Sequence, residues 1–217
     1  MTLTPITISL YLYGAFVLAL TTAEYRADSR AQWFLKPACA LGFIIIALQS
    51  GALETFYGQV ILAALCLCAV GDAALLSRKS QKLFLLGMTA FALGHFAYAF
   101  AFFGPYMSRI GTYTGLGLAA LLVGVFKIFI WNNIPRDMRL PVSIYIIIIG
   151  LMLVLAVDYA FAAQIWVVGI AAIMFAVSDF FVGKDRFVER KSWHALVITP
   201  LYFGAQALFA LSAAHTL

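Results

Sequence analysis

The chain of 217 residues is 65% hydrophobic and only 11% charged, and its formal net charge is +5 at pH 7. An ordinary soluble domain is about half apolar and a quarter charged, so this composition excludes disordered chains and small disulfide-bonded proteins and leaves too little polar surface for a soluble enzyme. We therefore expect an all-α polytopic membrane protein in which residues 1–217 form a single transmembrane domain.

Apolar runs separated by polar or turn-forming residues predict eight membrane spans. In chain order they cover about residues 4–21, 34–51, 57–77, 82–103, 112–131, 140–157, 162–182 and 194–214. The connections are short, so consecutive spans are antiparallel neighbours. The first run has no basic residue before it and no small-residue cleavage pattern after it, which predicts a retained span rather than a removable signal peptide.

Basic residues gather at the odd-numbered connections. These connections carry Arg26, Arg30 and Lys36, then Arg78, Lys79 and Lys82, then Arg136 and Arg139, and finally Lys184, Arg186, Arg190 and Lys191. At the even-numbered connections only Arg109 occurs. The positive-inside rule then predicts that the odd connections are cytoplasmic and that both termini face away from the cytoplasm. We expect a protein of the bacterial inner membrane whose positive charge meets lipid headgroups and not nucleic acid.

Three ionisable side chains lie well inside predicted spans, namely Asp72 in the third, His95 in the fourth and Asp179 in the seventh, whereas Lys36 and Lys127 lie near span ends. Such groups are costly in hydrocarbon unless they are paired or solvated, so they are candidate functional residues. For each aspartate the alternative is a structural ion pair with a basic side chain such as Lys36, and for His95 it is an interhelical hydrogen bond. Both aspartates fall in the cytoplasmic third of the bilayer, and this matched depth favours a functional role.

Two matched spacings suggest an internal repeat. Asp72 and Asp179 each follow a small residue near the inner end of an odd-numbered span, and His95 and Tyr202 follow them by the same 23 residues. An even number of spans in each copy makes such repeats parallel, related by an axis along the membrane normal. The two aspartates would then approach each other across that axis. The expected four-helix repeats are residues 1–104 and 105–217.

Several motifs occur in order along most of the chain. They are Lys36-Pro37, Gly71-Asp72-Ala73-Ala74-Leu75, Gly87-Met88-x-x-Phe91-x-x-Gly94-His95-x-x-Tyr98, Tyr145 with Met152, Ser178-Asp179 and Pro200-x-Tyr202-x-x-x-Gln206. In these residues the chain resembles the YhhN family of membrane proteins, which includes the lysoplasmalogenases. The resemblance implies an eight-span fold. It also implies hydrolysis of the vinyl ether bond of an alkenyl-glycerophosphocholine or -ethanolamine, with release of a fatty aldehyde and a glycerophospho-base.

This chemistry makes specific demands on the site. A vinyl ether is stable to base and opens by acid: a proton adds to the alkenyl carbon beyond the ether carbon, and water attacks the resulting oxocarbenium ion. The enzyme must supply a protonated carboxylic acid and a negative charge that stabilises the cation. Two neighbouring buried aspartates can supply both. We expect Asp72 and Asp179 to do so, without choosing which is the acid, and His95 to orient or deprotonate the water.

We expect five residues to bind the substrate: Lys36, Tyr98, Tyr145, Tyr202 and Gln206. Lys36 would contact the phosphate at the cytoplasmic mouth, whereas Arg78 and Lys79 are better explained as topology signals. Tyr202 and Gln206 would hold the carboxylates or the ether and glycerol oxygens of the substrate.

Neither a cofactor nor a metal ion is expected. A zinc site generally takes three protein ligands, and two aspartates with the single imidazole of His95 make a poor set. The three cysteines, Cys39, Cys66 and Cys68, lie in apolar runs and are predicted to be small buried residues. His194 lies near an interface and is predicted to be an anchor.

The alternative function is a small proton-coupled transporter, because parallel repeats, two intramembrane carboxylates and a histidine also suit a proton relay. Against it, Pro37, Pro141 and Pro200 are predicted in or just after the first turns of their spans and not at equivalent midplane positions. A scaffold without chemistry is the third option. The expected partners are a lysophospholipid substrate and membrane lipids, and no protein partner is predicted.

Overall fold

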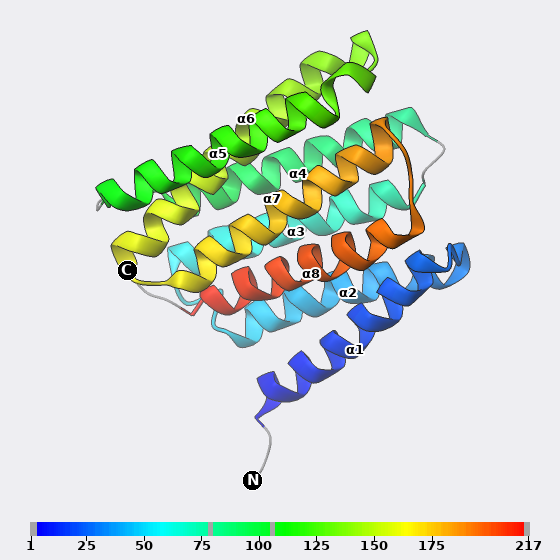
Figure 1. Ribbon diagram of the computed structural model, residues 1–217. Coiled ribbons are helices and arrows are strands. Elements are labelled where there is room, and N and C mark those ends of the chain that lie inside the picture. Colours follow the sequence, from blue (N-terminus) through cyan, green and yellow to red (C-terminus); the bar gives the residue numbers. More distant parts are fainter. Residues whose placement is uncertain (1–3, 78–79, 105–106, 215–217) are drawn as a thin grey trace.

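The computed structural model describes residues 4–77, 80–104 and 107–214, and this part of the chain contains helices but no strands (Figure 1). The long helices are α1 (Pro5–Tyr25), α2 (Ser29–Gln49), α3 (Phe56–Leu76), α4 (Gln81–Phe102), α5 (Arg109–Phe129), α6 (Arg136–Ala163), α7 (Trp166–Phe187) and α8 (Ala195–Ser212). Two single 3₁₀ turns, η1 (Trp131–Asn133) and η2 (Ser192–His194), lie in connections. Each of the eight long helices lies in a segment that is long and apolar enough to cross a membrane. The predicted all-α, eight-span fold class is confirmed.

Side-chain caps fix where most of the helices begin. A hydroxyl or carboxylate oxygen accepts a hydrogen bond from a backbone N–H in the first turn, which satisfies a donor that has no partner within the helix. The capping residues of α1 to α5 are Thr4, Asp28, Thr55, Ser80 and Ser108. After α2 the chain reverses at Gly51, whose φ of +80° is accessible to glycine at little cost.

Two predicted spans are too short. The cap at Asp28 lets α2 begin at Ser29, so Pro37 lies in the interior of the helix and not near its start as predicted. Helix α6 continues to Ala163 through Asp158, where a connection was predicted. The buried Asp158 carboxylate is satisfied there, because it accepts hydrogen bonds from the Ser108 backbone N–H and the Thr112 hydroxyl.

The helices form one bundle with α1 and α5 at opposite margins (Figure 1). Consecutive helices pack against each other with the exception of α4 and α5, which each pack on α6 and make little contact with one another in the described part of the chain. The prediction that consecutive spans are neighbours is therefore wrong for this pair. The two halves of the chain meet where α4 packs on α6 and α2 packs on α8. Close approach of α3 and α4 depends on small residues: a Cβ atom on Gly94 would lie 2.8 Å from the Cys68 sulfur. This approach holds His95, the next residue of α4, against the centre of the bundle.

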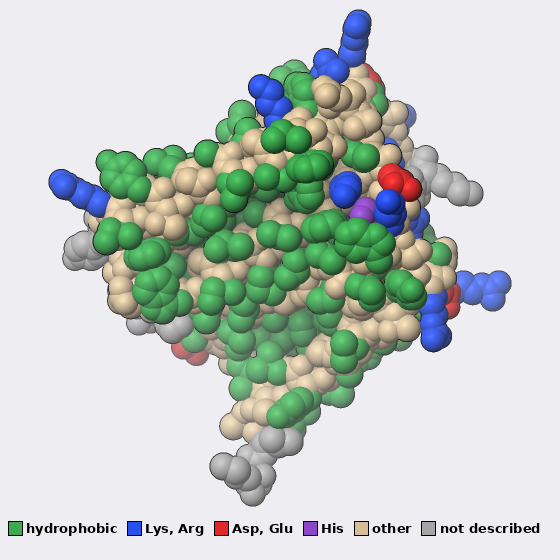
Figure 2. Space-filling view, in the orientation of Figure 1, with side chains coloured by type: hydrophobic (Ala, Val, Ile, Leu, Met, Phe, Trp, Pro, Cys, Tyr) green, Lys and Arg blue, Asp and Glu red, His purple; other side chains and the backbone are tan. Residues whose placement is uncertain are grey.

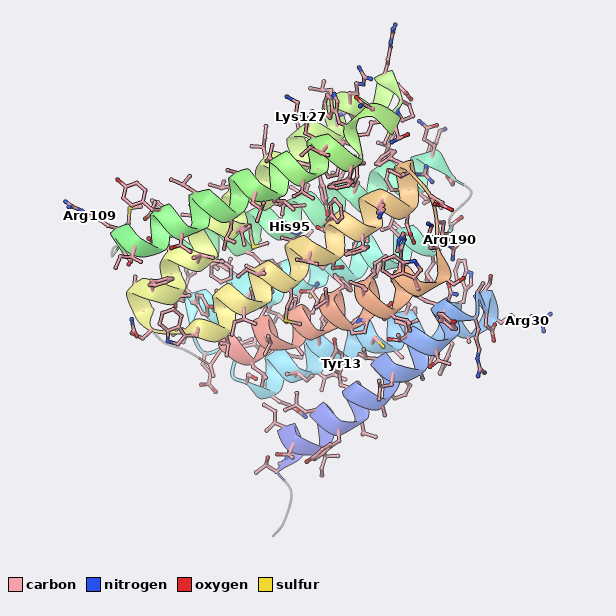
Figure 3. All side chains as sticks on the ribbon, viewed as in Figure 1. Tyr13, Arg30, His95, Arg109, Lys127 and Arg190 are labelled. Atoms are coloured by element: carbon pink, nitrogen blue, oxygen red, sulfur yellow. The ribbon has the colours of Figure 1, made fainter. Side chains whose placement is uncertain are left out.

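Hydrophobic side chains cover most of the surface in Figure 2, and Lys and Arg side chains gather mainly at one end of the molecule. Figure 3 labels Arg30 and Arg190 at that end and Arg109 at the other. The distribution is the one expected for a bundle that presents an apolar belt to lipid. Cys66 lies on this exposed surface, so its prediction as a buried residue is wrong, whereas Cys39 and Cys68 are buried. The sequence could not separate Cys66 from Cys68, because one face of α3 is exposed at the lipid-facing surface and another packs on protein, and apolar residues occur on both faces.

Candidate active site

Asp72 lies near the end of α3 and is only 2% exposed. Its Oδ1 atom is 3.4 Å from Nζ of Lys36 on α2, and its Oδ2 atom accepts a hydrogen bond of 2.6 Å from the Tyr202 hydroxyl on α8. Both partners present donors to the carboxyl group. The surroundings therefore suit an ionised carboxylate, which accepts such bonds at both oxygens.

Lys36 lies between two carboxyl groups. Its Nζ atom is 3.9 Å from Oε1 of Glu24 on α1, and the Thr199 hydroxyl of α8 donates to the other oxygen of Glu24. The ion pair considered above as a structural alternative for Asp72 is thus present, but the second carboxyl leaves this group of three with a formal negative charge. Sequence analysis missed Glu24 because it falls just beyond the predicted first span.

Asp179 on α7 has a different set of partners. Its Oδ2 atom accepts a 2.9 Å hydrogen bond from the Tyr145 hydroxyl and lies 3.3 Å from Nε2 of His95. On the other side of the imidazole ring, Nδ1 is 2.6 Å from the carbonyl oxygen of Phe91. A carbonyl oxygen only accepts, so Nδ1 must carry a hydrogen.

The hydrogen on Nδ1 determines what His95 presents to Asp179. With its hydrogen on Nδ1, a neutral imidazole presents a lone pair at Nε2, and Nε2 has no hydrogen-bond partner among the described residues. A lone pair facing an ionised carboxylate would be repelled. The 3.3 Å approach of Nε2 to the carboxyl oxygen thus becomes favourable where either group carries a hydrogen between them.

Tyr98 and Gln206 lie one layer behind Tyr202. The Gln206 side-chain N–H donates to the Tyr202 oxygen at 3.1 Å, and the Tyr98 hydroxyl donates to the Gln206 oxygen at 2.7 Å. Both residues are completely buried. The chain of hydrogen bonds Tyr98–Gln206–Tyr202 ends at Asp72. It therefore orients the Tyr202 hydroxyl, which donates a hydrogen bond to the Asp72 carboxylate.

The two aspartates line one inner cavity of about 100 Å³, together with Lys36, Tyr145 and Tyr202. The rest of its wall is mostly apolar and comes largely from α4 to α7. No hydrogen bond joins the two carboxyl groups in the described part of the chain. His95, Tyr98 and Gln206 do not line this inner cavity, and His95 reaches it through Asp179, between the central helices (Figure 3).

The inner cavity continues in two directions. Toward the ends of the helices it shares Lys36 and Arg186 with a polar vestibule of about 500 Å³, whose wall also includes Arg190 and Lys191. Toward the bundle surface it shares Leu122, Ala176 and Phe180 with an apolar side groove of about 250 Å³ between α5, α6 and α7. Polar vestibule, inner cavity and apolar side groove thus follow one another. Arg78 and Lys79 lie outside the described residues.

His194 departs from its prediction as an interfacial anchor. It is completely buried, and its Nδ1 atom contacts the carboxylate of Asp185 beside the vestibule. The acidic partner nine residues earlier, across the connection between α7 and α8, is what compensates its burial. Within the described ranges, no group of three His, Cys, Asp or Glu side chains is arranged to hold a metal ion.

Comparison with known proteins adds independent information. The model of the YhhN family matches residues 31–213. The lysoplasmalogenase TMEM86A of Bos taurus is 32% identical over 190 residues, which cover 85% of this chain and 74% of that protein. The lysoplasmalogenase TMEM86B of Homo sapiens is 33% identical over 193 residues, covering 86% and 78%. The uncharacterized membrane protein YhhN of Escherichia coli O157:H7 is 27% identical over 145 residues, covering 66% and 64%. No solved structure matches significantly.

Proposed function

Because this chain belongs to the YhhN family, we propose that it is an ether hydrolase of the lysoplasmalogenase type, which cleaves the vinyl ether bond of lysoplasmalogens. The observation that carries the proposal is the pair of aspartates facing one cavity with unlike partners. Asp72 meets a cation and a hydroxyl donor, whereas Asp179 meets a hydroxyl donor and the imidazole of His95. The reaction needs one ionised and one protonated group, and we assign the ionised role to Asp72 and the proton to Asp179 with His95.

In the first step, the proton held by Asp179 and His95 passes to the alkenyl carbon beyond the ether carbon. The π electrons of the double bond form the new C–H bond, and the ether carbon becomes part of an oxocarbenium ion. The Asp72 carboxylate stabilises this cation, because a fixed negative charge in a cavity of low dielectric acts where positive charge develops. Tyr202 keeps that carboxylate oriented. Asp179, which lines the cavity, is the acid, and His95 acts through it.

In the second step, water adds to the cationic carbon and gives its proton back to the Asp179–His95 pair, which restores the starting state. The resulting hemiacetal has a hydroxyl and an ether oxygen on one carbon. Transfer of the hydroxyl proton to the ether oxygen breaks the C–O bond and releases the aldehyde and the glycerol hydroxyl. One water molecule is consumed overall, and no oxidant or reductant is needed.

The order of the three spaces supports an orientation for the substrate. The headgroup of a single-chain lipid would occupy the vestibule, its alkenyl bond the inner cavity and its hydrocarbon chain the side groove between α5 and α7. The vestibule lies at the end that carries most Lys and Arg residues, which the positive-inside rule makes cytoplasmic. We therefore propose an inner-membrane enzyme that takes lipid from the cytoplasmic leaflet and has both termini on the other side.

The first prediction concerns activity. Purified wild-type protein incubated with an alkenyl lysolipid should release fatty aldehyde and should leave the saturated alkyl analogue intact, because only the vinyl ether is protonated on carbon. The Asp72→Asn and Asp179→Asn variants should each lose at least about 100-fold in rate, since each removes a charge or proton that the transition state requires. Aldehyde is measured by coupled reduction.

The matched control is Asp158→Asn. Asp158 is also a buried aspartate of a membrane-spanning helix, but it binds Ser108 and Thr112 and does not line the inner cavity. This variant should keep its turnover, and size-exclusion profiles should show that all three variants fold. Full aldehyde release from both site variants would contradict the mechanism. Proton-dependent flux into liposomes without aldehyde would instead support the transporter alternative.

A further inference from the structure

Arg186 stands where the vestibule narrows into the inner cavity, because its side chain lines both spaces. Its guanidinium carbon lies 4.1 Å from the ring centroid of Phe84 on α4. Stacking of this kind holds the guanidinium plane over the ring and leaves the N–H groups at its edge available to a ligand. A long side chain that would otherwise be mobile is thus held at the entrance.

Nearby acidic groups have other partners. In the described part of the chain, no carboxylate lies within ion-pair distance of Arg186 or Arg190. The two acidic side chains of the vestibule are Asp185, which contacts His194, and Glu24, which contacts Lys36. The same wall carries four basic side chains, namely Lys36, Arg186, Arg190 and Lys191. Lys36 is paired with Glu24 and Asp72, and Lys191 lies 3.0 Å from Glu189, so Arg186 and Arg190 are the basic side chains of this wall that have no acidic partner among the described residues.

A topology signal alone does not require this arrangement. Positive-inside residues act by their position along the chain, and water can solvate them without any partner. Arg139 illustrates that case: it stacks on Trp131 with its guanidinium carbon 5.6 Å from the ring, but it lines none of the three spaces. Arg186 has the same kind of stacking and, in addition, a place on the path to the two aspartates.

We propose that Arg186, at the junction of the vestibule and the inner cavity, is the centre of a phosphate-binding subsite for the phosphodiester of a lysophospholipid headgroup, and that Arg190 on the vestibule wall adds to its positive charge. The identification of the phosphate as a lipid headgroup rests on the proposed function. A guanidinium group binds two phosphate oxygens at once, with a geometry that a lysine cannot reproduce. The glycerol backbone then extends past Lys36, which brings the ether bond to Asp72 and Asp179.

The test measures binding of a lipid that cannot be cleaved. Saturated 1-O-alkyl-glycerophosphocholine is titrated into the full-length protein in nanodiscs, beside 1-O-alkylglycerol, which lacks the phosphate, and inorganic phosphate. For Arg186→Met we expect an affinity about 10- to 100-fold lower for the phosphate-bearing lipid, because the variant loses a hydrogen bond between charged groups. Affinity for 1-O-alkylglycerol should be unchanged. Arg186→Lys should recover only part of the loss, and Arg139→Met should bind both lipids like wild type.

Each other outcome has a definite meaning. Equal weakening of both lipids by Arg186→Met would show a structural role and overturn the subsite, as would unchanged binding of the phosphate-bearing lipid. Inorganic phosphate that binds as tightly as the lipid would overturn the assignment to a headgroup in favour of a free anion. Arg186-dependent lipid binding in a protein that forms no aldehyde from alkenyl lysolipid would leave the subsite standing and remove the proposed hydrolase activity.

Discussion

Tyr202 and Tyr145 each donate a hydrogen bond to one of the two aspartates, but the second partner differs between the sites. Asp72 has the ammonium group of Lys36, whereas Asp179 has the imidazole of His95. A cation stabilises an ionised carboxylate, whereas the lone pair of an imidazole accepts a hydrogen bond from a protonated carboxyl group. In the proposed mechanism, the identity of one neighbour at each site therefore divides the two roles, acid and stabiliser, between two chemically identical side chains.

A graded series of hydroxyl deletions tests the role of Tyr202. Tyr202→Phe removes the donor to the Asp72 carboxylate, and we expect kcat to fall about 10- to 100-fold, since hydrogen bonds to charged groups contribute about 1.5–3 kcal/mol. Tyr98→Phe removes a bond two residues further away and should reduce kcat only a few-fold. Steady-state kinetics on an alkenyl lysolipid gives both values.

The control for this series is Tyr13→Phe. Tyr13 is also buried, and its hydroxyl donates to the backbone oxygen of Phe203 on α8, outside the Tyr98–Gln206–Tyr202 chain. Its loss should lower thermal stability with little change in kcat. Equal losses of kcat in all three variants would mean that α8 is merely displaced, and the proposed orientation of Asp72 by Tyr202 would be abandoned.

Among individual residues, sequence reasoning works best where burial is expensive. An ionisable group inside a span is conspicuous in an apolar sequence, which is why Asp72, Asp179 and His95 could be selected. Glu24 could not, because it lies at a helix end where carboxylates are common, and only the fold brings Lys36 to it. Nor could the sequence assign Tyr98 to the layer behind Tyr202, since that depends on the rotation of α4 and α8 about their axes.

At the scale of the helices, there is a simple physical reason why the sequence does not reveal which face of each helix is buried. A helix in water shows its core by an apolar stripe, but a membrane helix is apolar toward lipid and toward protein alike. Hydropathy therefore predicts that eight spans exist without telling which face of each is buried. The helix ends are also poorly defined, because a capped and hydrogen-bonded carboxylate such as Asp158 can continue α6 beyond its apolar run.

The side groove gives a prediction at this scale. Ala176 on α7 is buried and lines both the inner cavity and the side groove. Ala176→Leu should narrow their junction and lower kcat/KM about 10-fold or more for lysolipids with long alkenyl chains, because added methylenes in a fitted apolar site change such ratios by about 1–3 kcal/mol. Short-chain substrates, which need not enter the groove, should be affected much less. The measurement is a chain-length series of alkenyl lysolipids.

Val177→Leu is the matched control, because Val177 lines the side groove without lining the inner cavity. It should leave the chain-length profile close to that of wild type. If Ala176→Leu lowers activity uniformly across all chain lengths, the hydrocarbon chain does not leave the inner cavity through this junction.

At the scale of the whole molecule, helix packing supports the proposal that residues 1–104 and 105–217 are repeats. Exchange of the two halves turns the contact of α2 with α8 into that of α6 with α4, and both contacts exist. The contact of α1 with α8 has no comparable counterpart between α5 and α4 in the described part of the chain. The site follows the same exchange. Asp72 takes one partner from its own half and Tyr202 from the other, and Asp179 takes Tyr145 and His95 in the same way. A functional site on the axis between two repeats would require matching helix contacts and matching partners for the two aspartates.

Parallel repeats of four spans place corresponding helix ends on one side of the membrane, so a single orientation decides which leaflet supplies the substrate. We predict that alkaline phosphatase fused after Leu217 is active in bacterial cells and that green fluorescent protein there is dark. Fusions after Glu189, in the connection that borders the vestibule, should give the converse result. The reverse pattern at both positions would turn the vestibule toward the outer leaflet. The chemistry at Asp72 and Asp179 would stand in that case, but the lipid would have to arrive from the side opposite to most of the positive charge.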